Sequence, residues 1–411
     1  MTHLNGGAGR KTGIALLGVA LMAATARGDG CMFAVKEVGQ SQKMVASHRQ
    51  EAAIATDGQT VRVTLRTHFR AGPEELAWIV PVPAKPDTVE CGNDALFADL
   101  DRETAPRFYR NEYHGGGFSC GCAASQNAVV MSEATVRVEA SGAAGIFKYE
   151  VLAATDAKDL VDWLTKNHYA VPPRAAAVFG PYVQAGWHWL AMRVRPEATG
   201  QKDLAPHPVV YTYRDAELKY PLTISQLSAD AESEIILYVL GPARYACTNW
   251  KNATSEELAE PSDRRQFQAD LTSPSGTNYE SLLREASRRS DHRLFVTEFA
   301  DDYEIPRALL AELRGNSPGL KGEAVYLTRL RAVMPPTSMD RDVLLVPVTW
   351  QSVSPRLQVA AVGDMSRLGG PAVSMGATGL LCAGLLLPRR RWGRAAAVGC
   401  LTAACLAFAM I

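Results

Sequence analysis

The chain has 411 residues, of which 47% are hydrophobic and 21% charged, and its 43 basic and 43 acidic side chains leave a formal net charge of zero. A balanced charge, without a basic run long enough for such a patch, argues against nucleic-acid binding, which needs cationic side chains gathered on one face. Between its two apolar ends the chain is long enough for one large domain or two smaller ones with sizeable cores.

The first 26 residues have the three parts of an export signal. Arg10 and Lys11 supply a basic region, residues 14–22 an apolar core, and Ala24-Thr25-Ala26 an A-x-A cleavage site. The apolar core is too short to span a membrane. The sequence therefore predicts that residues 1–26 are a signal peptide and that the chain is exported.

Strand patterns begin soon after the signal. In residues 60–69 the apolar side chains Val61, Val63, Leu65 and Phe69 alternate with the polar side chains Arg62, Thr64, Arg66 and His68. A period of two predicts a half-buried strand. Its polar face could collect an anionic group, but we interpret it as a solvated face. The Asp57-Gly58 pair predicts a hairpin that joins this strand to another at 51–56.

The segment 76–83 is apolar but contains Pro81 and Pro83. Prolines cannot donate to a ladder, so we expect this strand to end at a sheet edge or to run out as an extended segment. The uniformly apolar strand at 234–240 is expected deep in a sheet. Further strands are predicted at 128–139, 145–153, 187–195, 209–213, 222–226, 294–299, 325–330 and 343–348.

Helices are fewer than strands. The clearest begins after Asp156, whose side chain should cap it, and has a buried stripe from Ala157 to Leu164. A second is expected from Pro173, interrupted near Gly180-Pro181. Others are predicted at 93–100, 279–288 and 306–313. This balance predicts an α+β fold with a largely antiparallel β-sheet and a few packed helices. We expect residues 31–250 to form the main exported domain and residues 251–365 the C-terminal part of the exported region.

The last 41 residues of the chain, 371–411, consist of two uncharged apolar runs around four arginines, Arg389, Arg390, Arg391 and Arg394. Each run is about 17 residues long, at the short end of what a helix needs to cross a hydrocarbon core. Arginines beside membrane segments stay on the cytoplasmic side. The sequence therefore predicts a C-terminal transmembrane helical hairpin with a basic cytoplasmic turn, and a periplasmic or extracellular location for the bulk of the chain.

Five cysteines fall in the exported part: Cys31, Cys91, Cys120, Cys122 and Cys247. Disulfides persist outside the cytoplasm, and an odd number leaves one thiol free, intermolecular or bound to a metal. Cys120 and Cys122, with His114 nearby, could hold copper(I) or zinc, or exchange disulfides with a substrate. We favour structural disulfides, and no cofactor is predicted.

His188 lies between Trp187 and Trp189 in the strand at 187–195. A histidine in an apolar row can act as an acid or base. We interpret it instead as a buried side chain whose nitrogens are satisfied. A pocket that gathers His188, His168 or His207 with carboxylates would favour a hydrolase without a recognisable motif.

The exported region resembles the bacterial family called domain of unknown function 2330 (DUF2330). The resemblance covers roughly residues 30–350 and is carried by Cys31, the segment Glu74-Glu75-Leu76-Ala77-Trp78-Ile79-Val80-Pro81-Val82-Pro83, Cys120-Gly121-Cys122, Asp162-Trp163-Leu164, Gly186-Trp187 and Tyr238-Val239-Leu240-Gly241. A typical member opens with a cysteine- and glycine-rich patch, which this chain reduces to Gly30-Cys31. The resemblance implies a secreted or membrane-anchored protein with no assigned activity, so no catalytic residues carry over.

These observations predict an uncharacterised, membrane-anchored extracytoplasmic protein that acts as a non-catalytic binding or structural module of the envelope. Its expected partners are the membrane, through the C-terminal hairpin, and an envelope protein, with no nucleic acid. The alternatives are a metal- or thiol-active module at Cys120 and Cys122, or a hydrolase without a recognisable motif.

Overall fold

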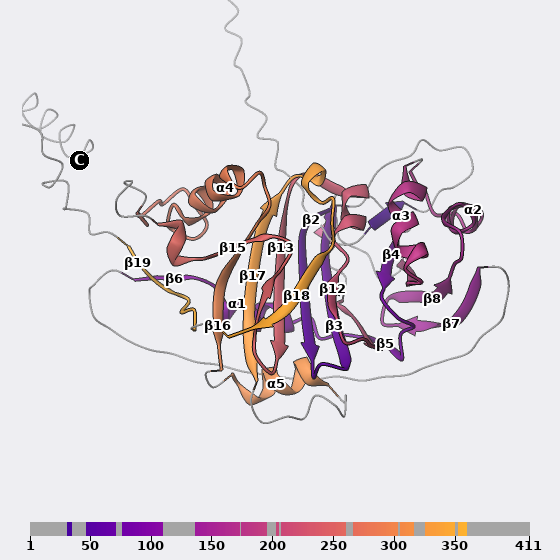
Figure 1. Cartoon of the computed structure of the whole chain (residues 1–411), viewed down its shortest axis with the longest axis horizontal. Coiled ribbons are helices and arrows are strands. Elements are labelled where there is room, and N and C mark those ends of the chain that lie inside the picture. The colour runs from indigo at the N-terminus through magenta and orange to yellow at the C-terminus, as the bar shows by residue number, and fades with distance from the viewer. Residues whose placement is uncertain are drawn as a thin grey trace, which may run out of the picture. The chain divides into compact units, whose positions relative to one another are not determined.

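A nine-stranded sheet forms the centre of the protein (Figure 1). The computed structural model describes residues 31–34, 47–70, 76–109, 136–172, 174–194, 203–204, 207–259, 266–302, 305–315, 325–349 and 352–359. The strand order is β15 (Lys251–Thr254), β16 (Leu294–Asp301), β17 (Tyr326–Met334), β13 (Ala229–Gly241), β2 (Ser47–Thr56), β3 (Thr60–Arg70), β11 (Val209–Arg214) and β5 (Thr88–Cys91), and β10 (Asp203–Leu204) also pairs with β3. All pairs are antiparallel except β13 with β2 and β15 with β16.

Three smaller sheets accompany it. A five-stranded antiparallel sheet has the order β1 (Cys31–Ala34), β4 (Leu76–Val82), β9 (His188–Val194), β8 (Phe147–Ala153) and β7 (Arg137–Ala144). A three-stranded sheet consists of β12 (Leu218–Tyr220), β18 (Val343–Val348) and β14 (Arg244–Cys247), and a parallel ribbon pairs β19 (Arg356–Gln358) with β6 (Arg107–Tyr109). The α+β class with mainly antiparallel pairing is confirmed.

Both faces of the nine-stranded sheet are covered, because alternate residues of its strands point to opposite sides. Ile235 and Leu237 of β13 share a core cluster with Trp78 of the five-stranded sheet and Leu345 of the three-stranded sheet. Ile236, Tyr238 and Leu240 pack on the opposite face against helices. The uniformly apolar run in β13 is therefore explained by burial on two sides, as predicted.

Five helices cover the sheets in the described part of the chain. The other face of the nine-stranded sheet carries α1 (Leu96–Thr104), α4 (Tyr279–Arg289) and α5 (Arg307–Arg314). The outer face of the five-stranded sheet carries α2 (Ala157–Lys166) and α3 (Ala175–Gln184), which pack on Ala77, Ile79 and Trp189. The helices thus lie outside the two facing sheets.

The predicted cap of α2 is confirmed: the Asp156 side chain accepts hydrogen bonds from the backbone N–H groups of Lys158 and Asp159. We expect Asp156→Ala to lower the free energy of unfolding by about 1 kcal/mol, because two helix N–H groups lose their acceptor. Urea unfolding would measure this. Asp162→Ala, which removes only the exposed pair with Lys158, is the control and should change stability by less than about 0.5 kcal/mol.

Two expected elements are wrong. Residues 222–226 form no strand but lie largely in a 3₁₀ helix, η2 (Thr223–Leu227). Its first backbone N–H groups find acceptors in other elements: Thr223 donates to Asp342 Oδ1 and Ile224 to the Tyr182 hydroxyl. The expected break at Pro181 is also absent, since α3 runs through it. Burial of its apolar side chains in the core beside the five-stranded sheet outweighs one lost backbone hydrogen bond.

Pro81 lies inside β4, a strand with neighbours on both sides. β1 pairs only with Leu76 to Ile79, so at Pro81 the strand has β9 as its single partner. The proline thus occupies a locally unpaired edge, which is the position that its missing N–H permits.

Strands from both sides of residue 250 share the nine-stranded sheet, and the described residues, 31 to 359 with their gaps, belong to one compact unit. Among the described residues no helix is long and apolar enough to cross a membrane. The signal peptide predicted at 1–26 and the hairpin predicted at 371–411 lie outside the described residues.

Candidate functional site

The predicted metal or thiol site cannot be placed, because His114, Cys120 and Cys122 lie outside the described residues. Two other cysteines are free: Cys91 is half-buried and Cys247 is buried. Burial raises the pKa of both thiols. Disulfides that involve Cys31, Cys120 or Cys122 stay a prediction.

Only one of the two ring nitrogens of His188 has the partner that the sequence analysis predicts. Its Nε2 lies 3.4 Å from Glu139 Oε2, and the same carboxylate lies 3.0 Å from Lys85 Nζ. Glu139 is the extra residue of a bulge in β7, which turns its side chain toward the histidine. Nδ1 of His188 is buried and has no hydrogen-bond partner in the described structure. Burial lowers the pKa of the ring although Glu139 opposes this.

His207 and His168, the other two histidines considered for a pocket, lie elsewhere in the structure. His207 pairs with Asp94 at the surface, with Nδ1 2.7 Å from the carboxylate. His168 is exposed just after α2, in a left-handed conformation with φ 64°. The structure therefore does not bring His168, His188 and His207 together.

The polar face of strand 60–69 differs from the expected solvated face. Arg62 and Thr64 are buried, and Arg66 and His68 are only partly exposed, because α1 and α5 lie near this side of the sheet. The anionic group that this face collects is the chain's own Glu51, a fully buried carboxylate. Its Oε2 lies 2.7 Å from Arg66 Nη2 and 3.1 Å from His68 Nε2.

Glu51 is one end of a larger network, at whose centre six side chains alternate in charge around a closed ring. Following the contacts, the charge ring consists of Arg49, Asp101, Arg329, Glu298, Arg331 and Glu234, and Glu234 returns to Arg49. The members come from β2, α1, β17, β16 and β13. Three arginines and three carboxylates make the ring neutral.

The contacts within the ring are unequal. Nitrogen–oxygen distances are 2.7 Å for Arg329 to Asp101 and 2.6 Å for Arg329 to Glu298. Arg331 lies 3.4 Å from Glu298 and also contacts Glu234 directly. Arg49 is held more loosely, at 3.9 Å from Asp101 and 3.8 Å from Glu234. The tight side of the ring is therefore the pair of arginines on β17.

Hydroxyl groups and a further carboxylate complete the network around these arginines. The Tyr279 hydroxyl donates to Glu298 Oε1 at 2.6 Å, and Arg329 Nη1 donates to the Tyr238 hydroxyl at 3.2 Å. Glu280 accepts from Arg331 Nη2 at 2.9 and 2.8 Å. Glu298 and the arginine pair are almost fully buried, so these bonds replace the water that the charges lost.

The ring keeps its arginines charged. Burial alone would lower the pKa of Arg329, but Tyr238 and the carboxylates of Glu298 and Asp101 raise it. The pKa of Arg331 is raised for the same reason, against burial, by Glu234, Glu298 and Glu280. Neither guanidinium group can serve as an acid or base at ordinary pH.

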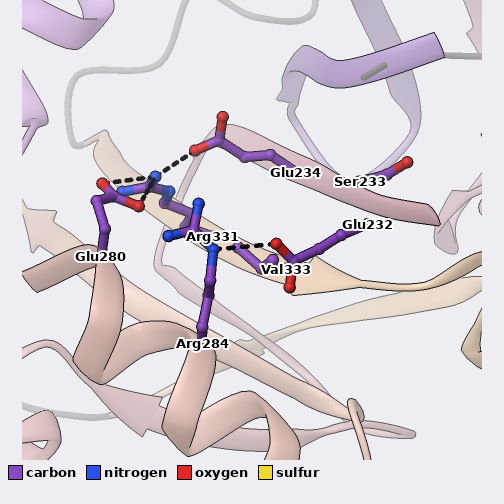
Figure 2. A pocket seen from close by; sticks show the side chains of 7 residues that line it. All are labelled: Glu232, Ser233, Glu234, Glu280, Arg284, Arg331 and Val333. Carbon is purple, nitrogen blue, oxygen red and sulfur yellow. Dashed lines mark hydrogen bonds and ion pairs between the residues drawn. The ribbon is translucent and has the colours of Figure 1, made fainter. Parts of the chain in front are cut away.

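Beside the ring, a small recess opens between β13, β17 and α4 (Figure 2). It is lined by Glu232, Ser233, Glu234, Glu280, Arg284, Arg331 and Val333. The ladder between β13 and β2 is interrupted after Ala229 and resumes at Glu234, which brings Glu232 to Arg284 at 3.0 Å. Each carboxylate and guanidinium group in the recess therefore has a partner of opposite charge.

The charge ring was not predicted from the sequence. A signal for it exists, since Arg329 and Arg331 alternate with apolar residues in a strand and Glu234 begins an otherwise apolar run. Charged side chains inside strands that are buried on both faces must find partners. The sequence does not say which partners, because side chains in direct contact within the ring are up to 228 positions apart.

The acid sensitivity of the network can be tested at Glu51. Burial alone would raise the pKa of this carboxyl, but the hydrogen bond from His68 and the charges of Arg49 and Arg66 lower it to about 2, from an ordinary value of 4.5. A carboxyl whose pKa falls on folding stabilises the protein above its unfolded-state pKa, and that stabilisation is lost as pH drops toward its folded-state pKa.

We therefore expect Glu51→Gln to destabilise the protein most above pH 4.5, with the difference from wild type shrinking as pH falls toward 2. Guanidinium unfolding at a series of pH values would measure both proteins. Glu217→Gln, at an exposed carboxylate paired with Lys219, is the control and should stay near wild type throughout. A constant difference between Glu51→Gln and wild type across this range would contradict the assignment.

Comparisons with known proteins give a family but no activity. The model of DUF2330, described as an uncharacterised protein conserved in bacteria, matches residues 25–346. No curated protein matches the chain.

Among solved structures, baculovirus P35 matches with 10% identity and a TM-score of 0.30, covering 47% of this chain and 64% of that one. A mutated baculovirus P35 after caspase cleavage matches with 7% identity, a TM-score of 0.27 and coverages of 46% and 64%. The chain thus spans less than two thirds of either structure.

Proposed function

Because this chain belongs to DUF2330, a bacterial family without an assigned activity, we propose that it is a membrane-anchored extracytoplasmic protein that works by binding or structural contact in the cell envelope. Catalysis is not part of this proposal. The exported region would act as a rigid module, and the C-terminal hairpin would hold it at the membrane.

The observation that carries the module proposal is the charge ring. Its arginines and carboxylates are bound to one another, and two of the hydroxyl groups that touch it, those of Tyr238 and Tyr279, are engaged as well. Charged groups held in this way connect α1, α4 and four strands, and each has a partner of opposite charge within the fold. Such a network supports a structural role for the most concentrated set of ionisable groups in the described residues.

The location rests on the two ends of the sequence. A basic region, a short apolar core and an A-x-A site open the chain, and two apolar runs around an arginine cluster close it. Both features independently favour export of the residues between them. An extracytoplasmic module with such a tail would stay at the membrane surface.

Reporter fusions in the bacterial host test the location. Alkaline phosphatase, which folds only after export, is fused after Leu368, after Trp392 or after Ile411. The proposal expects activity at the first and last positions and none at Trp392, within the basic turn. Deleting residues 371–411 should move the exported protein from the membrane fraction to the soluble extracytoplasmic fraction. Activity of a cytoplasmic reporter at Leu368, with no phosphatase activity there, would overturn the proposal.

A further inference from the structure

The two-stranded ribbon of β6 and β19 has two different faces. Phe108 and Leu357 point inward and pack in the cluster that contains Tyr279 of α4. Their neighbours in the ribbon point outward and are exposed: Arg107 and Tyr109 on β6, and Arg356 and Gln358 on β19. The outer face therefore carries two guanidinium groups and an aromatic ring, and Nη2 of Arg107 also donates to the backbone carbonyl of Arg102.

The two arginines lie side by side, since Arg107 and Arg356 are directly paired in the register of the ribbon. Tyr109 is one of two exposed large hydrophobic side chains in the described residues, with 44% of its surface accessible. The carboxylates just before β6 are engaged, because Asp99 and Glu103 of α1 both contact Arg102. Cations beside an exposed tyrosine are the combination that suits a membrane–water interface, where rings sit at headgroup level and arginines meet anionic lipids.

The position of the ribbon in the chain points to the same partner. Val359 follows β19 directly, and its backbone N–H donates to the carbonyl of Tyr109. Eleven residues separate it from the apolar tail that begins at Pro371. Even fully extended they reach only about 40 Å. In Figure 1 the ribbon lies beyond β16, at the left, and α2 and α3 lie at the right.

We propose that the outer face of the β6–β19 ribbon, through Arg107, Arg356 and Tyr109, docks the exported region on the anionic lipid surface into which the tail inserts. This inference rests on the proposed membrane anchor. A tether of this length keeps the ribbon close to the bilayer, so weak headgroup contacts suffice to orient the module. Each arginine near an anionic surface raises the equilibrium constant for binding about fivefold, and the pair raises it about thirtyfold.

The test uses the full chain reconstituted into vesicles of phosphatidylcholine alone or with 30 mol% phosphatidylglycerol. Amide hydrogen exchange is followed by mass spectrometry in peptides that cover the ribbon, with peptides of α2 as internal reference. We expect ribbon peptides to exchange at least about threefold more slowly in the anionic vesicles, with no change in α2. The effect should vanish in about 0.5 M salt, because salt screens exposed charges.

Variants identify the residues responsible. Arg107→Glu with Arg356→Glu should abolish the lipid-dependent protection, and the milder pair Arg107→Gln with Arg356→Gln should weaken it if the first variant folds poorly. Lys148→Glu with Arg214→Glu is the matched control, because both side chains are exposed on other strands. In this control variant, the ribbon peptides should show the same protection from hydrogen exchange on anionic vesicles as in wild type.

Flotation of the vesicles in alkaline carbonate reports separately on the tail. A chain that floats but shows no slower ribbon exchange on anionic vesicles overturns the docking proposal and leaves the anchor standing. A chain that does not float overturns the anchor, and ribbon protection on anionic vesicles at low salt would then support docking on its own. Protection that survives the charge reversal, or that appears equally on neutral vesicles, also overturns the role of the arginines.

Discussion

Replacing Arg329 by methionine is expected to lower the free energy of unfolding by about 3–5 kcal/mol. The substitution keeps much of the side-chain volume but leaves Glu298, which is completely buried, without its 2.6 Å partner. It also leaves Asp101 and the Tyr238 hydroxyl without their donor. Guanidinium unfolding, followed by tryptophan fluorescence at pH 7, would measure the change.

Two further variants separate the charge ring from a general effect of losing an arginine. Arg102→Met removes an exposed guanidinium that pairs with Asp99 on α1, and it should cost less than about 1 kcal/mol. Arg329→Met combined with Glu298→Leu removes both buried charges, so it should cost clearly less than the sum of the two single changes. Additive costs, or a single-variant cost near that of Arg102→Met, would show that the buried pair is not coupled as the geometry indicates.

Replacing Trp189 by alanine should cost about 3–5 kcal/mol, because it removes the largest fully buried side chain between the five-stranded sheet and α3. Its ring centroid lies 4.8 Å from that of Phe179 and 5.8 Å from that of Tyr182. The cavity left by the indole would face both helix side chains. The same unfolding measurement applies.

The indole N–H of Trp189 supplies a second test. It is buried and has no hydrogen-bond partner in the described structure, so Trp189→Phe gives up no hydrogen bond. We expect this variant to cost less than about 1.5 kcal/mol. A loss as large as that of the alanine variant would mean that the indole nitrogen has a partner, such as a buried water, that stabilises the fold.

Local signals predicted the elements well where one local rule decides the structure. Asp156 caps α2 because its side chain needs only the next two N–H groups, and Val343–Val348 forms β18 within its predicted bounds. The alternation in residues 60–69 also holds, with Val61 and Val63 in the core. Each of these outcomes depends on contacts within a few residues or on one buried face.

The wrong or missing predictions concern features that depend on contacts between residues far apart in the sequence. Residues 222–226 look like a strand, yet Asp342 and Tyr182, distant in sequence, supply acceptors that favour a 3₁₀ turn. The sequence pattern of β3 predicts a solvated polar face. Neighbouring residues in the sequence do not indicate that helices cover this face or that Glu51 lies beside Arg66. The charge ring was missed for the same reason, since its partners are chosen by the arrangement of strands and not by spacing along the chain.

The pairing of β2 with β13 has a consequence for how the chain acquires its structure. Gln50 and Ile235 are register partners in the centre of the sheet, although about 185 residues separate them, and such distant pairing is slow to form. If the chain is exported as proposed, N-terminus first, β2 and β3 would reach the far side of the membrane long before β13. β2 could then pair with β3 but would lack its other neighbour, β13. Under the proposed export, a holding chaperone on the far side of the membrane should therefore raise the yield of folded protein.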